Sequence, residues 1–266
     1  ALPISRGDYL AAGAYGADLT LNAAQTVDEV EISAATTVTG QSARLLGGAY
    51  VQSAAIANTV AVGGEGATIQ GTIDQSSAAT VRASNFLGSQ YIPAEADFSS
   101  QAIANAVAVN SDQASNQNLT VRQRSRGEIV EAATSANAAN AWDLAGRANA
   151  AANQAVFANQ GGALITATDQ ANAGRVRAAT VVTAYDFGSA TAQARGVGHE
   201  GSAGNNDIYL EIDNLQLNNG QIDASATFSG GAGYDAYVGA DAVGNSITGY
   251  ACSQCEGYID ARNSQT

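Results

Sequence analysis

The run Ala55-Ile-Ala-Asn-Thr-Val-Ala-Val62 recurs as Ala102-Ile-Ala-Asn-Ala-Val-Ala-Val109, and this repetition decides the fold. Asn58, Asn105 and Asn153 occupy the same place in successive copies, 47 and 48 residues apart. Internal repeats with a period of about 20–50 residues are typical of architectures in which similar units stack. The sequence therefore predicts a repeat protein rather than a conventional globule. After residue 190 this run becomes hard to recognise.

Two further series of short runs recur with the same phase. The first is spaced by 50, 50, 45 and 44 residues, at Leu19, Ile69, Leu119, Leu164 and Ile208. The second is spaced by 49, 49, 46 and 46 residues, at Ile32, Val81, Val130, Val176 and Ile222. Apolar and polar residues alternate along these runs, as in Asp207-Ile-Tyr-Leu-Glu-Ile-Asp213, and this period of two is typical of a β-strand.

These series predict an all-β fold, a repetitive parallel β-solenoid (β-helix) with equivalent strands stacked in parallel. One block cannot bury its own apolar face, whereas stacked blocks can. An antiparallel β-sandwich is the alternative, because strands at regular spacing with glycine turns also describe it. A helix near Ser135–Ala148 is a local alternative, since Ala has the highest helix propensity. We assign residues 1–230 to about five solenoid blocks and residues 231–266 to a divergent C-terminal block.

The composition favours a narrow interior and an exported protein. Of the 266 residues, 29 are Gly, while only 6% are aromatic and 13% charged, so small side chains must fill much of the core. All 11 basic residues other than histidine are Arg, and Met is absent. Polar β-rich repeats without Lys or Met favour an extracellular location at the outer cell surface. A chain that begins at Ala1 suggests removal of a signal peptide, or trimming.

The net charge of −13 disfavours two classes of partner. Nucleic acid is excluded, because a strongly acidic chain repels the phosphate backbone. An anionic membrane surface is disfavoured for the same reason. The chain has no run of 18 apolar residues, so we expect no transmembrane segment.

Cys252-Ser-Gln-Cys255 is the sharpest chemical motif. A closed zinc site needs four ligands, a second cysteine pair is absent and His199 is the only histidine, so we expect no metal. In an exported protein, Cys252 and Cys255 are expected to form a disulfide, either a local clamp on the C-terminal turn or a bridge to another subunit. No cofactor is expected, because the glycine-rich stretches lack the G-K-[ST] of a phosphate loop.

Candidate catalytic groups are sparse. His199 lies in the Gly-rich stretch 196–201, which predicts a solvated loop. A Ser-His-Asp triad can be assembled from residues far apart in sequence, but no G-x-S-x-G elbow occurs. Two carboxylate clusters do not recur at stacked positions; they are Asp28, Glu29 and Glu31, and Glu211 with Asp213. We therefore expect no catalytic residue and no enzyme.

Arg122, Arg124 and Arg126 alternate along one predicted strand, so all three should point to the same face. Such a face can meet a negative patch on another subunit or an acidic polymer. A plain solvated strand face is the simpler interpretation.

The C-terminal segment Ala242-Val-Gly-Asn-Ser-Ile-Thr-Gly-Tyr-Ala-Cys-Ser-Gln-Cys-Glu-Gly257 resembles the holdfast anchor protein family of stalked bacteria. The Ala-rich and Asn/Gln-rich repeats support this resemblance. They are also similar in composition to curli-type surface fibre proteins, although the blocks are about twice as long as one strand–turn–strand rung and the Gln/Asn ladder is incomplete. The resemblance implies a secreted outer-surface protein that tethers an adhesive polysaccharide to the cell envelope as an amyloid-like fibre.

We therefore expect an extracellular structural protein that self-assembles into a β-rich surface filament and anchors adhesive holdfast polysaccharide to the envelope. Its expected partners are copies of itself, joined head to tail through open strand edges, together with envelope anchor proteins and the polysaccharide. The alternatives are a polysaccharide-acting β-helix enzyme and a carbohydrate-binding surface module. The last is favoured by tyrosines that crowd the final third of the chain: Tyr209, Tyr234, Tyr237, Tyr250 and Tyr258.

Overall fold

The computed structural model describes residues 4–39, 44–207, 209–252 and 257–266, and within them it contains thirteen β-strands and no helix. The short strands are β2 (Leu19–Val27), β3 (Glu31–Thr39), β5 (Thr68–Ser77), β7 (Asn116–Ser125), β9 (Ala163–Asn172), β11 (Tyr209–Asn218) and β13 (Tyr258–Gln265). The longer strands are β1 (Ile4–Tyr15), β4 (Ala49–Glu65), β6 (Thr80–Asp112), β8 (Ile129–Asn159), β10 (Arg175–Asn205) and β12 (Ile222–Ala251).

All pairings between these strands are parallel, and the strands form two sheets. One sheet has the order β13-β11-β9-β7-β5-β2, and the other has the order β1-β4-β6-β8-β10-β12 with β3 paired to β6. Equivalent strands of successive blocks therefore lie side by side. This arrangement confirms the predicted parallel β-solenoid, and the antiparallel sandwich is wrong.

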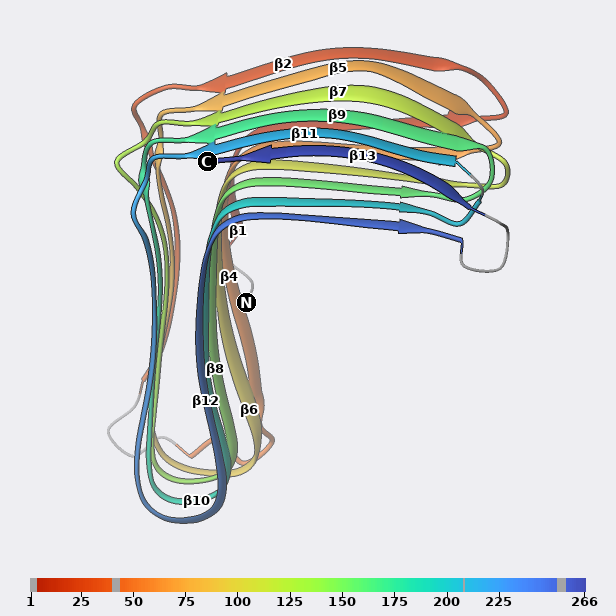
Figure 1. Ribbon diagram of the computed structural model, residues 1–266. Helices are drawn as coiled ribbons and strands as arrows, with labels where there is room; N and C mark the ends of the chain where they lie inside the picture. Colours follow the sequence, from red (N-terminus) through yellow and green to blue (C-terminus); the bar gives the residue numbers. More distant parts are fainter. Residues whose placement is uncertain (1–3, 40–43, 208, 253–256) are drawn as a thin grey trace.

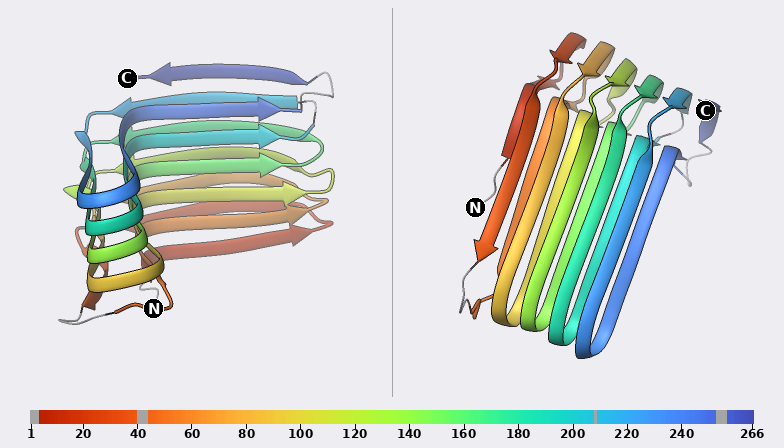
Figure 2. Two further views of the ribbon diagram at one scale, coloured as in Figure 1. Left: turned by 90° about the horizontal axis from the view of Figure 1, so that it is seen from below. Right: turned by 90° about the vertical axis from the view of Figure 1, so that its left-hand side faces the viewer.

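One coil of the solenoid consists of a short strand followed by a long strand that bends sharply. In Figure 1 the long strand runs down a narrow arm, turns at the tip, returns along the arm and then crosses beneath the short strands. Figure 2 shows the coils side by side, with the two termini at opposite ends of the stack. In the first coil, β3 and β4 together take the place of a long strand.

Five full coils span residues 19–65, 68–112, 116–159, 163–205 and 209–251. A partial coil lies at each end. Before the first full coil, β1 supplies only the segment that crosses beneath the short strands. After the last full coil, β13 supplies only a short strand.

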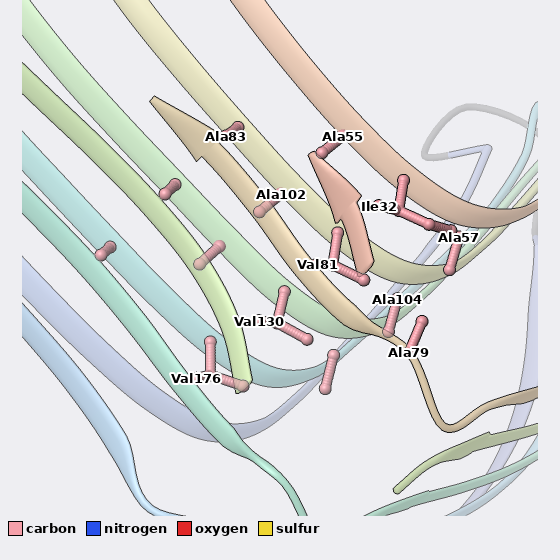
Figure 3. Packing of buried hydrophobic residues seen from close by; sticks show 14 of the residues in the cluster. Ile32, Ala55, Ala57, Ala79, Val81, Ala83, Ala102, Ala104, Val130 and Val176 are labelled. Atoms are coloured by element: carbon pink, nitrogen blue, oxygen red, sulfur yellow. The ribbon is translucent and has the colours of Figure 1, made fainter. Parts of the chain in front are cut away.

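The core is narrow and consists mainly of alanine and valine stacked from coil to coil. At the bend between the arm and the upper layers, Ala55 and Ala102 pair in register beside Val81 and Val130 (Figure 3). Bulkier side chains gather under the short strands and near the tip of the arm, among them Ile69, Leu119, Leu164, Leu87, Phe98 and Leu144. The alanine stack lets two strand layers approach closely, which is why the chain needs few large apolar residues.

The second strand series is confirmed residue by residue. Ile32 pairs with Val81, Val81 with Val130, Val130 with Val176, and Val176 with Ile222. These positions start the long segments of successive coils and are buried, apart from Ile222 in the last full coil, which is partly buried.

The first series is wrong by two residues after its first step. Leu19 pairs with Ile69 as predicted, but Ile69 pairs with Gln117 instead of Leu119. A shift of two residues keeps every side chain on the same face of a strand, so hydrophobic alternation cannot detect it. Ile208 lies outside the described residues.

The local alternatives are also resolved. Ser135–Ala148 lies within β8 and includes the turn at the tip of the arm, so the helix alternative is wrong. Tertiary packing between two limbs overrides the helix propensity of alanine here. β12 runs through residue 230 without a change in its register against β10, and β13 stacks on β11. The division of the chain at residue 230 stays a prediction.

Candidate functional site: polar ladders and two open ends

A row of six glutamines, one from each short strand of the sheet that ends in β13, runs through the stack. We call it the glutamine ladder: Gln25, Gln75, Gln123, Gln170, Gln216 and Gln265. Each amide nitrogen after the first donates to the side-chain oxygen of the preceding glutamine over 2.7–2.8 Å. The amides also bind the other sheet, as in Gln123 Nε2 to the backbone oxygen of Gln154 at 2.9 Å. The ladder thus joins neighbouring coils and both sheets.

The expectation that the Gln/Asn ladder is incomplete is therefore wrong for glutamine. Its signal was present in the sequence, because the six residues recur at steps of 50, 48, 47, 46 and 49. A search for a recurring polar residue, rather than for apolar positions, finds it. The same steps would also have given the correct register of the short strands.

A second polar row lies in the long strands, in the register Asp8, Asn58, Asn105, Asn153, His199 and Asn245. We call it the asparagine ladder. Asn58 Nδ2 donates to Asn105 Oδ1 at 2.8 Å, and Asn105 Nδ2 donates to Asn153 Oδ1 at 2.7 Å. Each of these amides also donates to a backbone oxygen of a short strand at 3.0 Å. The two ladders therefore tie the sheets together from opposite sides.

His199 occupies the fourth coil of the asparagine ladder, and the prediction of a solvated loop is wrong. Its side chain is buried within β10; Nδ1 accepts from Asn153 Nδ2 at 3.1 Å and Nε2 donates to the backbone oxygen of Leu217 at 3.0 Å. These partners assign the neutral tautomer with hydrogen on Nε2. Burial lowers the pKa of His199 to about 4, opposed by the Leu217 carbonyl and helped by nearby Arg124. The imidazole faces an amide and a carbonyl rather than the groups of a catalytic triad.

The flanking glycines misled the sequence interpretation. A Cβ at Gly198 would lie 2.4 Å from the backbone oxygen of Gly244, and one at Gly196 would lie 2.9 Å from that of Asp223. Glycine is present there because neighbouring backbones approach closely, not because the segment is a loop.

Both ladders have a direction, and both end in unused hydrogen-bonding groups. The glutamine ladder donates towards the N-terminal end, where Gln25 Nε2 donates to the backbone oxygen of Thr59 and keeps a second hydrogen. The asparagine ladder donates towards the C-terminal end as far as His199, which donates to Leu217 O rather than to Asn245. In the last coil, Asn245 Nδ2 donates to the backbone oxygen of Thr266 and likewise keeps a second hydrogen. Each end of the stack thus presents a side-chain amide hydrogen that can donate to another chain.

The two end coils expose strand edges and aromatic side chains. β1, β2 and β3 are edge strands at one end, and β12 and β13 are edge strands at the other. At the C-terminal end, four of the five tyrosines that the sequence singled out are exposed, and Tyr209 is partly buried; the four are Tyr234, Tyr237, Tyr250 and Tyr258. Tyr209 stacks on Tyr258 with ring centroids 5.7 Å apart. Tyr9 and Tyr15 are exposed at the N-terminal end.

The predicted arginine face exists, but its charges are largely matched within the chain. Arg122 lies 3.4 Å from Asp74, and Arg124 forms an ion pair with Asp169 on the next coil. Arg126 donates to the hydroxyl of Ser76 at 2.7 Å. Exposed pairs of this kind contribute little to stability, and they neutralise the face.

The two carboxylate clusters lie apart and do not converge. Asp28, Glu29 and Glu31 are exposed around the turn that leads into β3, while Glu211 accepts a hydrogen bond from Tyr209 at 2.8 Å. Among the described residues no three His, Cys, Asp or Glu side chains are grouped as metal ligands would be. The described part of the chain also contains no helix able to cross a membrane.

The predicted disulfide cannot be followed in full, because Cys255 lies outside the described residues. Cys252 follows β12 directly, at the point where the chain leaves the last full coil towards β13. The pairing of Cys252 with Cys255, within or between chains, stays a prediction.

The fold, the ladders and the open ends define a class: a repetitive parallel β-solenoid scaffold. The family model for holdfast attachment protein D matches residues 4–221, and the chain belongs to that family. Membership makes it a holdfast attachment protein associated with the cell surface or envelope. The segment that carried the sequence resemblance, residues 242–257, lies beyond the matched range. No curated protein and no solved structure matches the chain.

Proposed function

We propose that this chain is an exported structural protein that self-assembles head to tail into a β-rich filament on the outer cell surface, where it anchors the adhesive holdfast polysaccharide to envelope anchor proteins. The complementary partial coils at the two ends are the observation that supports assembly. Membership of the holdfast attachment protein D family supports the attachment role. A structural role also fits the two carboxylate clusters singled out in the sequence, which lie in different parts of the stack.

In the proposed junction, the C-terminal end of one copy meets the N-terminal end of the next. β13 of the first copy lies beside β2 of the second, and β1 of the second lies beside the last part of β12 of the first. The two partial coils then make one composite coil, in which β13 supplies the short-strand layer and β1 supplies the layer that crosses beneath it.

The glutamine ladder continues through this junction in its own direction, and the asparagine row gains one hydrogen bond across it. Gln25 of the second copy donates its remaining hydrogen to the side-chain oxygen of Gln265 of the first. Asn245 of the first copy donates its remaining hydrogen to the carboxylate of Asp8 of the second, which lies in register with Asn58. Continuous ladders and parallel strands along a stack are the features that stabilise cross-β assemblies.

The edge of β13 offers a sharp test. Thr266 N donates to Gln216 O and Thr266 O accepts from Asn218 N, so alternate residues of β13 bond to β11. Ala261, five residues earlier, therefore points its N–H to the open edge. Ala261→Pro removes that donor without removing a bond inside the chain, and proline is tolerated at such edge positions. Ala261→Ser at the same position keeps the donor and is the matched control.

Negative-stain electron microscopy of the purified proteins should show head-to-tail filaments for the unaltered chain and for Ala261→Ser. Ala261→Pro should give monomers or short filaments at the same concentration. Circular dichroism and thermal unfolding should be alike for the two variants, which separates loss of assembly from loss of fold. Monomers of the unaltered chain across salt and pH, or filaments of unchanged length from Ala261→Pro, would contradict the junction.

A further inference from the structure

A groove of about 550 Å³ lies at the tip of the arm, where four long strands turn side by side. It runs along the stack, across β6, β8, β10 and β12. Tyr91, Trp142, Asp186 and Tyr234 are among the residues that line it. With neighbouring strands about 4.8 Å apart, four strands give a groove about 14 Å long. None of the ladder residues lies in it.

The floor of the groove is a built aromatic platform. A Cβ at Gly188 would lie 2.9–3.0 Å from ring atoms of Trp142, so the indole lies over this glycine and only glycine fits beneath it. The rings of Trp142 and Tyr234 meet edge to face, with centroids 6.3 Å apart. Yet Trp142 is 62% exposed and Tyr234 is 86% exposed. A large, fixed apolar surface is thus presented to solvent.

The walls of the platform are acidic. Asp186 lines the groove itself, and Asp143 and Asp235 line an adjoining hollow that shares Trp142 and Tyr234. Ser189 Oγ donates to Asp143 Oδ1 at 2.8 Å, which holds that carboxylate in place. No arginine is among the residues that line either hollow, and Arg44, which lies over the ring of Tyr91, stands at the β6 end of the groove, with β8 and β10 between β6 and the Tyr234 strand β12. The platform therefore favours a ligand that is positively charged as well as able to stack on aromatic rings.

Between the strands that form the groove no backbone edge is open, and only the outer edge of β12 is unpaired. Asn140 pairs with Asp186 and Asp186 pairs with Ala232, so the strands already use their hydrogen bonds on one another. A ligand must be held by ring faces and carboxylates instead. Pyranose rings meet this requirement, because one face of the ring is apolar while hydroxyl and amino groups project from its edge.

We propose that this groove binds an extended oligosaccharide whose sugars carry protonated amino groups. Trp142 and Tyr234 stack on the sugar rings, and Asp143, Asp186 and Asp235 bind the amino groups. The inference rests on the proposed attachment function for the presence of a polysaccharide. It adds the place of contact and the chemical class of the sugar.

Trp142 is the only tryptophan, so intrinsic fluorescence reports on the groove directly. We expect a saturable fluorescence change on titration with a fully deacetylated glucosamine hexamer, weakened by added salt. The fully N-acetylated hexamer and cellohexaose, which are neutral, should bind at least roughly tenfold more weakly. In variants that alter the surroundings of Trp142, isothermal titration calorimetry measures the affinities for the three oligosaccharides independently of fluorescence.

Asp143→Asn combined with Asp235→Asn should weaken binding of the deacetylated hexamer by roughly tenfold or more. Tyr234→Ala should weaken it too and, at a side chain that is largely exposed, should leave the fold intact. Phe86→Ala is the control, because Phe86 in β6 is also an exposed aromatic side chain but lines neither hollow and lies in no edge strand. Circular dichroism confirms the fold of each variant.

No binding of the deacetylated hexamer would overturn the proposal. Equal binding of the N-acetylated hexamer would overturn the cationic class, and binding unaffected by the tip variants would overturn the location. Filament formation by the Ala261 variants is measured separately, so a failure here is distinct from a failure of the proposed function.

Discussion

Replacement of His199 by asparagine tests whether a buried neutral imidazole makes the asparagine ladder sensitive to acid. In the native chain Nδ1 accepts a hydrogen bond from Asn153, so a proton on Nδ1 would place two donors against each other. It would also place a charge in a buried position. An asparagine side chain at this position offers the oxygen and the N–H that the ladder uses in its other coils, and it does not titrate.

The size of the effect follows from the pKa. The unperturbed pKa of histidine is 6.5, and burial lowers that of His199 to about 4. The unfolded chain therefore binds this proton more readily than the folded chain between these values. The contribution of His199 to the free energy of unfolding is complete above about pH 6.5 and falls as the pH drops to about 4, by about 3 kcal/mol.

Urea unfolding of both proteins near pH 7, 5.5 and 4 measures this contribution. Carboxylates titrate in the same range, but they are common to the two chains and cancel in the difference. His199→Asn loses ring volume, which lowers the free energy of unfolding by roughly 1–3 kcal/mol at every pH. As the pH falls, the difference in this free energy between the variant and the native chain should shift in favour of the variant. Because the chain has one histidine, NMR of the imidazole gives the pKa directly. A difference that is constant with pH, or an imidazole that titrates near 6.5, refutes the reasoning.

Three further substitutions test the ladders and the core. Asp8→Asn should stabilise the chain by about 1 kcal/mol in thermal unfolding, because Asn58 Oδ1 is buried without a hydrogen-bond partner and an amide at position 8 can donate to it. Equal stability of the native chain and Asp8→Asn would contradict this. Gln123→Leu breaks three buried hydrogen bonds and should cost about 3 kcal/mol by urea unfolding, whereas Arg122→Leu on the exposed face should cost less than about 1. Ala150→Leu overfills the fully buried alanine stack and should cost about 3 kcal/mol; a loss below about 1 would mean that the layers can separate freely.

The repeat allowed much of the fold to be predicted. The series from Ile32 to Ile222 predicted the register of the long strands correctly. Each of its members is an apolar residue that begins a long segment and packs into the core. The Ala-Ile-Ala-Asn runs predicted the matching of Asn58 with Asn105 in the same way. The short strands were harder, since the Leu19 series alternates apolar and polar residues and a slip of two leaves that pattern unchanged.

The candidate site was less accessible to sequence reasoning. The glutamine ladder was recoverable from spacing alone, as its steps are as regular as those of the apolar positions. His199 was not, because its flanking glycines look like a loop until the neighbouring backbones at Gly244 and Asp223 are placed beside them. The platform at Trp142 depends on Gly188, which belongs to the next coil and meets the indole only through the turn of the arm.

The sequence by itself determined that this protein is a parallel β-solenoid, because a period that returns the same residue types to the same place can bury an apolar face only by stacking. Tertiary structure alone decided where the long strands bend and which side chains meet at the bend. It also decided that β1 and β13 each extend one of the two sheets beyond the full coils. These features arise from contacts between coils, and the spacing within one coil does not specify them.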